Sequence, residues 1–130
     1  MKKRIKTFTI ACLIFTPLFF YACEYAQILG FVQPSQVETY YANNITDSSA
    51  TIQVNVLAVG ALQIAEKGVC FSKTISPVIK DDRMICGTGY APYTAKIHGL
   101  DPGKKYYVRA YTINADGVTY GNEINFITLK

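Results

Sequence analysis

The sequence predicts an all-β domain, an antiparallel β-sandwich of six to seven strands, placed behind an N-terminal export segment. Two observations lead to this prediction. Beyond residue 37, short runs rich in Val, Ile, Thr and Tyr alternate with Asn, Asp, Gly and Pro at regular intervals. No window carries a sustained apolar period of 3.6 residues, so helices are not expected.

The net charge of +4 belongs to the N-terminus and not to the domain. Four of the thirteen basic residues are Lys2, Lys3, Arg4 and Lys6, which leaves nine basic residues to balance nine acidic ones from residue 23 onward. A neutral body has no field that would attract a polyanion, which excludes nucleic acid as a partner.

Residues 1–22 resemble a secretory signal peptide. A basic start is followed by an apolar stretch from Phe8 to Tyr21, broken only by Thr9, Thr16 and Pro17. A transmembrane helix is the alternative, but the stretch is shorter than the roughly 20 residues that a bilayer requires, and Pro17 weakens it as a helix.

The end of the apolar stretch, Ala22-Cys23, resembles the lipobox of bacterial lipoproteins. That resemblance implies that Cys23 receives lipid on its thiol and becomes the mature N-terminus. Acyl chains would then hold the chain on a membrane at about 0.8 kcal/mol per buried methylene. The alternative is ordinary cleavage near Ala26 and a soluble secreted product. The prediction is a cell-envelope protein anchored by lipid, at the outer membrane.

Residues 23–36 are predicted to be a lipidated tether. Their apolar residues follow no helical or strand period, and Gly30 and Pro34 interrupt regular secondary structure. The domain then occupies residues 37–130. Its strands are expected at 38–42, 50–59, 63–72, 93–97, 105–114 and 118–129, with a long irregular connection at 75–89. This number of short strands in a domain of this length is typical of an immunoglobulin-like sandwich.

The segment from Leu100 to Tyr111 resembles the corner before the sixth strand of fibronectin type III domains. The resemblance implies that Leu100 closes the core, that Pro102 and Gly103 turn the chain, and that Tyr106 is a tyrosine corner. In that role its hydroxyl bonds to turn backbone while its ring is buried.

The resemblance extends over roughly residues 36–130, through Gly68-Val69-Cys70-Phe71-Ser72, Gly87-Thr88-Gly89 and Tyr120-Gly121-Asn122-Glu123-Ile124. These segments look like a branch of fibronectin type III domains that is common in surface lipoproteins of Gram-negative bacteria. The core Trp of the family is absent, so Phe71, Phe126 and Tyr residues are expected to fill its volume.

Alternation from Tyr106 predicts that Tyr107, Arg109 and Tyr111 point outward on one sheet face. Tyr and Arg are favoured anchors of interfaces, and Tyr rings also stack on sugars, so this row is the predicted binding surface. The alternative is a cross-strand ladder that only stabilises the sheet.

Two cysteines, Cys70 and Cys86, lie in the predicted domain. A disulfide between them would suit an oxidising compartment and contribute roughly 2–4 kcal/mol. Two separate thiols are the alternative, because sequence does not establish the required approach of the two Cα atoms. Two Cys without a nearby His do not form a zinc site, so no metal or other cofactor is expected.

The residues that catalysis would need are missing from the pattern. His98 is the only imidazole, and no Ser lies in a nucleophile-elbow context. Asp81-Asp82 has no further carboxylates at ligand spacing and reads as a solvated loop. The prediction is therefore a non-enzymatic binding or adhesion module with a protein or glycan partner. A structural spacer or accessory subunit without its own ligand is the alternative.

Overall fold

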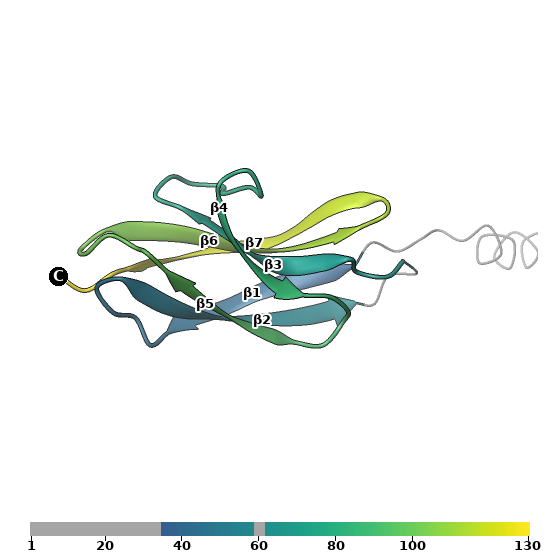
Figure 1. The fold of residues 1–130 in the computed structure, drawn as a ribbon, viewed down its shortest axis with the longest axis horizontal. Helices are drawn as coiled ribbons and strands as arrows, with labels where there is room; N and C mark the ends of the chain where they lie inside the picture. The colour runs from purple at the N-terminus through teal and green to yellow at the C-terminus, as the bar shows by residue number, and fades with distance from the viewer. Residues whose placement is uncertain (1–34, 59–61) are drawn as a thin grey trace, which may run out of the picture. The chain divides into compact units, whose positions relative to one another are not determined.

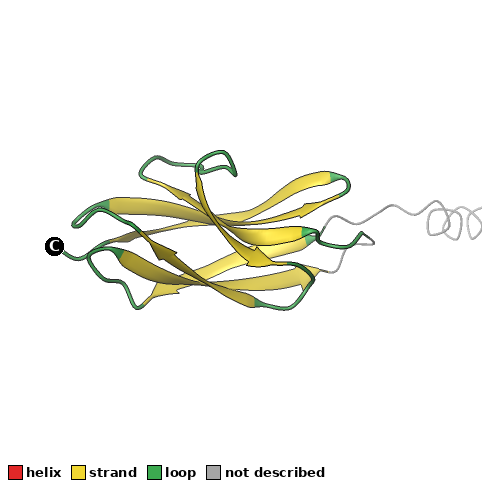
Figure 2. Cartoon of the chain, viewed as in Figure 1, coloured by secondary structure: helices red, strands yellow, loops and turns green. Residues whose placement is uncertain are grey.

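The computed structural model describes residues 35–58 and 62–130. The predicted signal peptide, the lipidation of Cys23 and the tether up to Pro34 lie outside the described residues. The described chain is built from seven strands, in chain order β1 Gln36–Asn43, β2 Ser49–Ala58, β3 Glu66–Ser72, β4 Asp82–Gly87, β5 Tyr93–His98, β6 Lys105–Asn114 and β7 Gly117–Ile127. Figure 1 shows their arrangement, and Figure 2 shows strands and loops only within this described part.

The strands form two antiparallel sheets, one of three strands in the order β1-β2-β5 and one of four in the order β4-β3-β6-β7. The predicted all-β, immunoglobulin-like sandwich of six to seven strands is therefore confirmed. Among residues 35–58 and 62–130, no helix is long and apolar enough to cross a membrane.

The strands form where alternation gives each of them one apolar face. In β2, Ile52 and Val54 are almost fully buried, whereas Gln53 and Asn55 between them lie on the outer face. The core between the sheets contains Val37, Ala50, Ile52, Val54, Val69, Phe71, Ala95, Ile97, Leu100, Tyr106, Val108, Ala110 and Phe126. Each fully buried side chain of Val, Ile or Phe size contributes about 1.5–3 kcal/mol.

Aromatic rings occupy much of this core, which contains no Trp. Phe71 and Phe126 are 8 % and 7 % exposed, and the Tyr106 ring stacks on Phe126 with 6.1 Å between ring centroids. These rings come from three strands of the four-stranded sheet, so the expectation that Phe and Tyr residues fill the core volume agrees with the packing.

One strand differs from the sequence prediction. The segment 75–89 was expected to be irregular, but it contains β4, which pairs with β3 along the edge of the four-stranded sheet. Asp82 and Arg83 at its start are exposed, because one side of an edge strand faces solvent and accepts charged residues. Because these charged residues interrupt the apolar alternation, the sequence pattern does not predict this strand.

Candidate binding surface

The predicted row of Tyr107, Arg109 and Tyr111 lies on the outer face of β6, but it is not an open surface. Tyr107 and Arg109 are half-buried, and Tyr111 is completely buried. The prediction that Tyr111 is exposed is wrong. The three side chains lie on the outer face of β6, as alternation predicts, but other parts of the chain cover that face.

Arg109 lies beneath the connection between β3 and β4, residues 73–81. Its Nη1 donates to the carbonyl oxygen of Pro77 at 3.5 Å, and its guanidinium sits 4.4 Å from the centre of the Tyr120 ring. The hydroxyl of Tyr120 accepts a hydrogen bond from the Ile79 amide at 3.0 Å. The connection is therefore fastened across the sheet face, and Arg109 serves as part of its support.

Tyr111 fills a space that a glycine leaves open. The strand register places Tyr111 opposite Gly68 on β3, and a Cβ at Gly68 would lie 3.0 Å from the Tyr111 hydroxyl. That hydroxyl donates to Glu66 Oε1 at 2.7 Å. Burial raises the pKa of Tyr111, and the bond to Glu66 adds to the effect because it stabilises the neutral phenol.

The corner residues run from the β5–β6 connection into the start of β6. Leu100 is 4 % exposed in the core, and Gly103 has a φ of 62°, a left-handed conformation that glycine adopts easily after the exposed Pro102. Tyr106 is 5 % exposed, and its hydroxyl accepts a hydrogen bond from the Asp101 amide at 2.8 Å. Beside this corner, an exposed ion pair with Lys73 lowers the pKa of Asp101.

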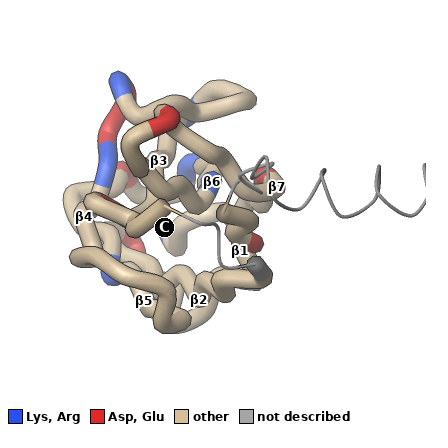
Figure 3. Tube along the Cα trace, turned by 90° about the vertical axis from the view of Figure 1, so that its right-hand side faces the viewer, with Lys and Arg blue, Asp and Glu red and all other residues tan. Residues whose placement is uncertain are grey.

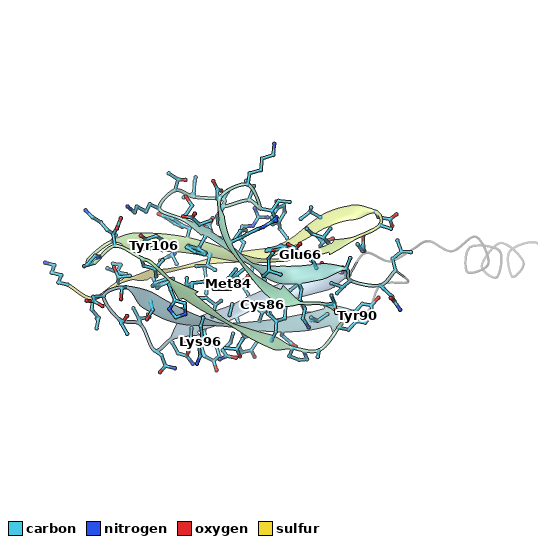
Figure 4. The ribbon with its side chains drawn as sticks, in the orientation of Figure 1. Glu66, Met84, Cys86, Tyr90, Lys96 and Tyr106 are labelled. Carbon is cyan, nitrogen blue, oxygen red and sulfur yellow. The ribbon has the colours of Figure 1, made fainter. Side chains whose placement is uncertain are left out.

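Cys70 and Cys86 are free thiols. Cys70 faces Arg83 across the β3–β4 ladder, and Cys86 lies three residues farther along β4 (Figure 4 labels Cys86). Three residues of strand span about 10 Å, which exceeds the roughly 7 Å limit for bridged Cα atoms. Of the two alternatives left open by the sequence, the described fold contains the separate thiols.

An exposed aromatic pair lies elsewhere, on β1. Tyr40 is 59 % exposed and Tyr41 is 49 % exposed, and their rings meet edge to face with 5.6 Å between centroids. Consecutive residues of a regular strand point to opposite faces, but the β1–β2 register shifts between Thr39 and Tyr41. This bulge leaves Tyr40 without a partner on β2 and brings both rings together.

The bulge is held from the opposite sheet. Asn122 of β7 accepts a hydrogen bond from the Thr39 amide at Oδ1 and donates from Nδ2 to the Thr39 carbonyl, both at 2.9 Å. The Thr39 hydroxyl accepts from the Ala110 amide at 2.8 Å. Thr39 is 1 % exposed, and its hydroxyl bond to Ala110 is buried, whereas the two bonds to the exposed Asn122 are partly buried. Together the three bonds fix the backbone just before the tyrosine pair.

The tyrosine pair borders a shallow hollow of about 220 Å³ across the three-stranded sheet. We call this surface the tyrosine trough, and its lining residues are Tyr40, Tyr41, Gln53, Val54, Asn55 and Pro92. Gln53 faces Tyr41 across the β1–β2 ladder, and its Oε1 accepts from the Thr94 hydroxyl at 2.9 Å. The trough offers aromatic faces, amides and no charged group.

The sequence pattern of residues 38–42 predicts an ordinary strand, and an ordinary strand does not bring two adjacent rings together. The signal in the sequence is the pair of adjacent Tyr residues that follows the alternating Val37 and Thr39. Strict alternation would place Tyr41 beside these two in the core, so the pattern indicates either an aromatic core residue or a bulge.

The described residues show no metal centre. Within residues 35–58 and 62–130, no three His, Cys, Asp or Glu side chains lie close enough together to hold a metal ion.

Comparisons with known proteins reveal likeness at the level of structure. No protein-family model matches the sequence, and no curated protein matches it. Similar solved structures include the sixth fibronectin type III domain of human fibronectin type III domain containing protein 3, with a TM-score of 0.53 and 18 % identity over 75 % of this chain and 87 % of that one.

Two further similar structures come from different settings. A fibronectin type III domain of human collagen XX has a TM-score of 0.54 and 16 % identity over 75 % of this chain and 95 % of that one. The sensor domain of the anti-sigma factor RsgI4 in Pseudobacteroides cellulosolvens has a TM-score of 0.54 and 19 % identity, over 75 % and 97 % respectively. Together with the strand order and the two sheets, these likenesses show that the chain contains a fibronectin type III-like β-sandwich.

Proposed function

We propose that this chain is a lipid-anchored binding module of the bacterial cell envelope that presents its β-sandwich to a protein or glycan and performs no catalysis. The observation that carries the proposal is the Tyr40–Tyr41 pair, with 59 % and 49 % of the two side chains exposed at a fixed bulge. Exposed Tyr rings on a rigid element are suited to recognition, because they supply contact area with little loss of side-chain entropy.

The anchoring part of the proposal rests on the sequence. The basic start, the apolar stretch and Ala22-Cys23 support acylation of Cys23 at the outer membrane. A coil of a dozen residues reaches roughly 20 Å, which would lift the sandwich clear of the lipid headgroups.

A structural spacer or accessory subunit is the second candidate, and one observation favours it. The described chain starts at Ser35, which bonds to Thr112 close to the β6–β7 turn, while Leu129 pairs with Gly103 and Thr46 at the opposite end of the sandwich. Figure 1 shows the C-terminus at that opposite end. A domain whose two ends lie at opposite poles can hold two attached parts apart without a ligand of its own.

The experiment uses the full-length chain purified from its native membrane and placed in liposomes through its own anchor. Peptide mass spectrometry first establishes whether Cys23 carries diacylglycerol at the mature N-terminus. Labelled soluble material from the cell envelope is then added in three portions: untreated, protease-treated, and periodate-treated to destroy vicinal diols of glycans.

A binding module adsorbs the untreated material saturably, and a Tyr40→Ala/Tyr41→Ala double variant loses that adsorption. Tyr107→Ala is the matched control, since Tyr107 lies on the outer face of the other sheet. A spacer shows either no adsorption or adsorption that is equal in the parent and in the Tyr40→Ala/Tyr41→Ala variant. Either result overturns the binding proposal. An unmodified N-terminus beyond Cys23 overturns the anchor.

A further inference from the structure

We infer that the tyrosine trough is a binding site for neutral glycans, in which Tyr40 and Tyr41 pack on sugar rings and Gln53 and Asn55 bond to their hydroxyl groups. The inference rests on the proposed binding function and names the chemical class of the ligand. Four observations together select a polyhydroxylated, uncharged ligand.

The first observation is the aromatic pair. The two ring planes meet at 61°, so one ring presents its face where the other presents its edge. A sugar ring has a face of C–H groups that packs on an aromatic face, and hydroxyl groups at its rim. Among the described residues neither Tyr hydroxyl has a hydrogen-bond partner, so both can bond to those rim hydroxyls.

The second observation is the pair of amides beside the rings. The Thr94 hydroxyl holds the carbonyl oxygen of Gln53, which turns the two N–H groups of that amide away from Thr94. Asn55 lies two residues along the same strand face and adds a further donor and acceptor. A glycan hydroxyl both donates and accepts, so amides satisfy it better than groups that only donate or only accept.

The third observation is the lack of charge. β2 contains no charged residue along its whole length, and Figure 3 shows charged positions concentrated instead around β4 and the connection before it. The charged residues nearest in register are Glu38, opposite Asn55, and Lys96, opposite Thr51, and neither lines the trough. An anionic polymer would find no paired cation here, whereas a neutral polymer requires none.

The fourth observation is the shape of the site. A hollow of about 220 Å³ is smaller than the roughly 300–1,000 Å³ that encloses a small molecule. It crosses from β1 over β2 to Pro92, the residue that precedes β5. A shallow trough across two strands and the residue before a third suits a chain of sugar units that lies along the surface, with one unit against the tyrosines.

The test is affinity electrophoresis of the full-length chain in a polyoxyethylene detergent, which has no sugar headgroup that could compete. The probes are four neutral polysaccharides, dextran, mixed-linkage β-glucan, galactomannan and yeast mannan, and one anionic polysaccharide, polygalacturonate. We expect at least one neutral polysaccharide to retard the chain. Its dissociation constant should rise at least tenfold in Tyr40→Ala and in Tyr41→Ala, and remain unchanged in Tyr107→Ala.

Two further variants keep the test valid if an alanine variant fails to fold. Tyr41→Phe retains the ring and should bind within about threefold of the parent. Asn55→Asp is nearly isosteric and partly exposed, and it should weaken binding about fivefold because it replaces two N–H donors with a negative charge. Thermal unfolding of each variant checks that the sandwich is intact.

Three outcomes overturn the inference: no retardation by any neutral polysaccharide, stronger retardation by polygalacturonate, or unchanged retardation of the Tyr40→Ala/Tyr41→Ala variant. The liposome experiment separates this failure from that of the proposed function. Suppose that adsorption depends on the tyrosines and is destroyed by protease but not by periodate. That result supports the proposed binding function with a protein partner, and it overturns the inference of a glycan ligand.

Discussion

Tyr106 connects the β5–β6 corner to the core of the sandwich. Its ring packs on Phe126 inside, while its hydroxyl receives the Asp101 amide at the surface end. The residue therefore combines apolar burial with a hydrogen bond to turn backbone. The corner depends on both contributions, and the two can be separated by removing the hydroxyl alone.

Replacement of Tyr106 by Phe should lower the free energy of unfolding by about 1 kcal/mol, because one hydrogen bond is lost while the ring remains. Urea denaturation measures the change. Tyr107→Phe is the control, since the Tyr107 hydroxyl has no partner among the described residues, and it should leave stability unchanged. Equal losses in the two variants would contradict the role given to the Asp101 bond.

Cys70 should make stability depend on alkaline pH. Burial raises the pKa of its thiol from 9.0 to about 11, so the folded chain keeps a proton that the unfolded chain releases earlier. The folded state then binds more protons between about pH 9 and 11, and stability falls as pH rises through that window. The melting temperature of Cys70→Ala should decline less over this window than that of the parent. Parallel curves would exclude the effect.

At the scale of elements, β1 and β7 position the candidate site jointly. The β6–β7 register is irregular between Arg109 and Tyr111, and the residues at this irregularity, Gly121 and Asn122, lie against β1. A Cβ at Gly121 would lie 2.7 Å from the Val37 carbonyl oxygen. The absence of a side chain at Gly121 therefore allows Asn122 to reach Thr39 and hold the bulge.

Gly121→Ala should push β1 away from β7 and lower the free energy of unfolding by roughly 1–3 kcal/mol, since backbone must shift to admit the methyl group. It should also weaken binding at the tyrosine trough, because the bulge loses its support. Chemical denaturation measures the first effect and affinity electrophoresis the second. Val118→Ala, an exposed position on the same strand, should change neither. Unchanged stability of Gly121→Ala would show that β1 is not held in this way.

At the scale of the whole molecule, the described sandwich packs its two sheets around one core, and its two cysteines are free thiols. The separation of Cys70 and Cys86 along the β3–β4 ladder keeps the two thiols apart in the folded state. Addition of dithiothreitol should therefore leave the melting temperature unchanged, and alkylation under denaturing, non-reducing conditions should label both residues. A fall in melting temperature on reduction would indicate a bridge between them.

The sequence by itself determined the features that depend on local pattern. Alternating apolar residues predict strands such as β2, and the corner from Leu100 to Tyr106 follows from the resemblance of that segment to fibronectin type III domains. The class of fold follows, since strands with one apolar face are buried only when two sheets pack together.

Only the tertiary structure decided which surfaces face solvent. The cover over Arg109 comes from residues 73–81, and the space for Tyr111 comes from Gly68, so neither burial could be read from β6 alone. The Tyr40–Tyr41 pair depends in the same way on Asn122, which is more than eighty residues away along the chain. The physical reason is that alternation assigns a side chain to a face of its sheet, whereas exposure depends on what distant segments place against that face.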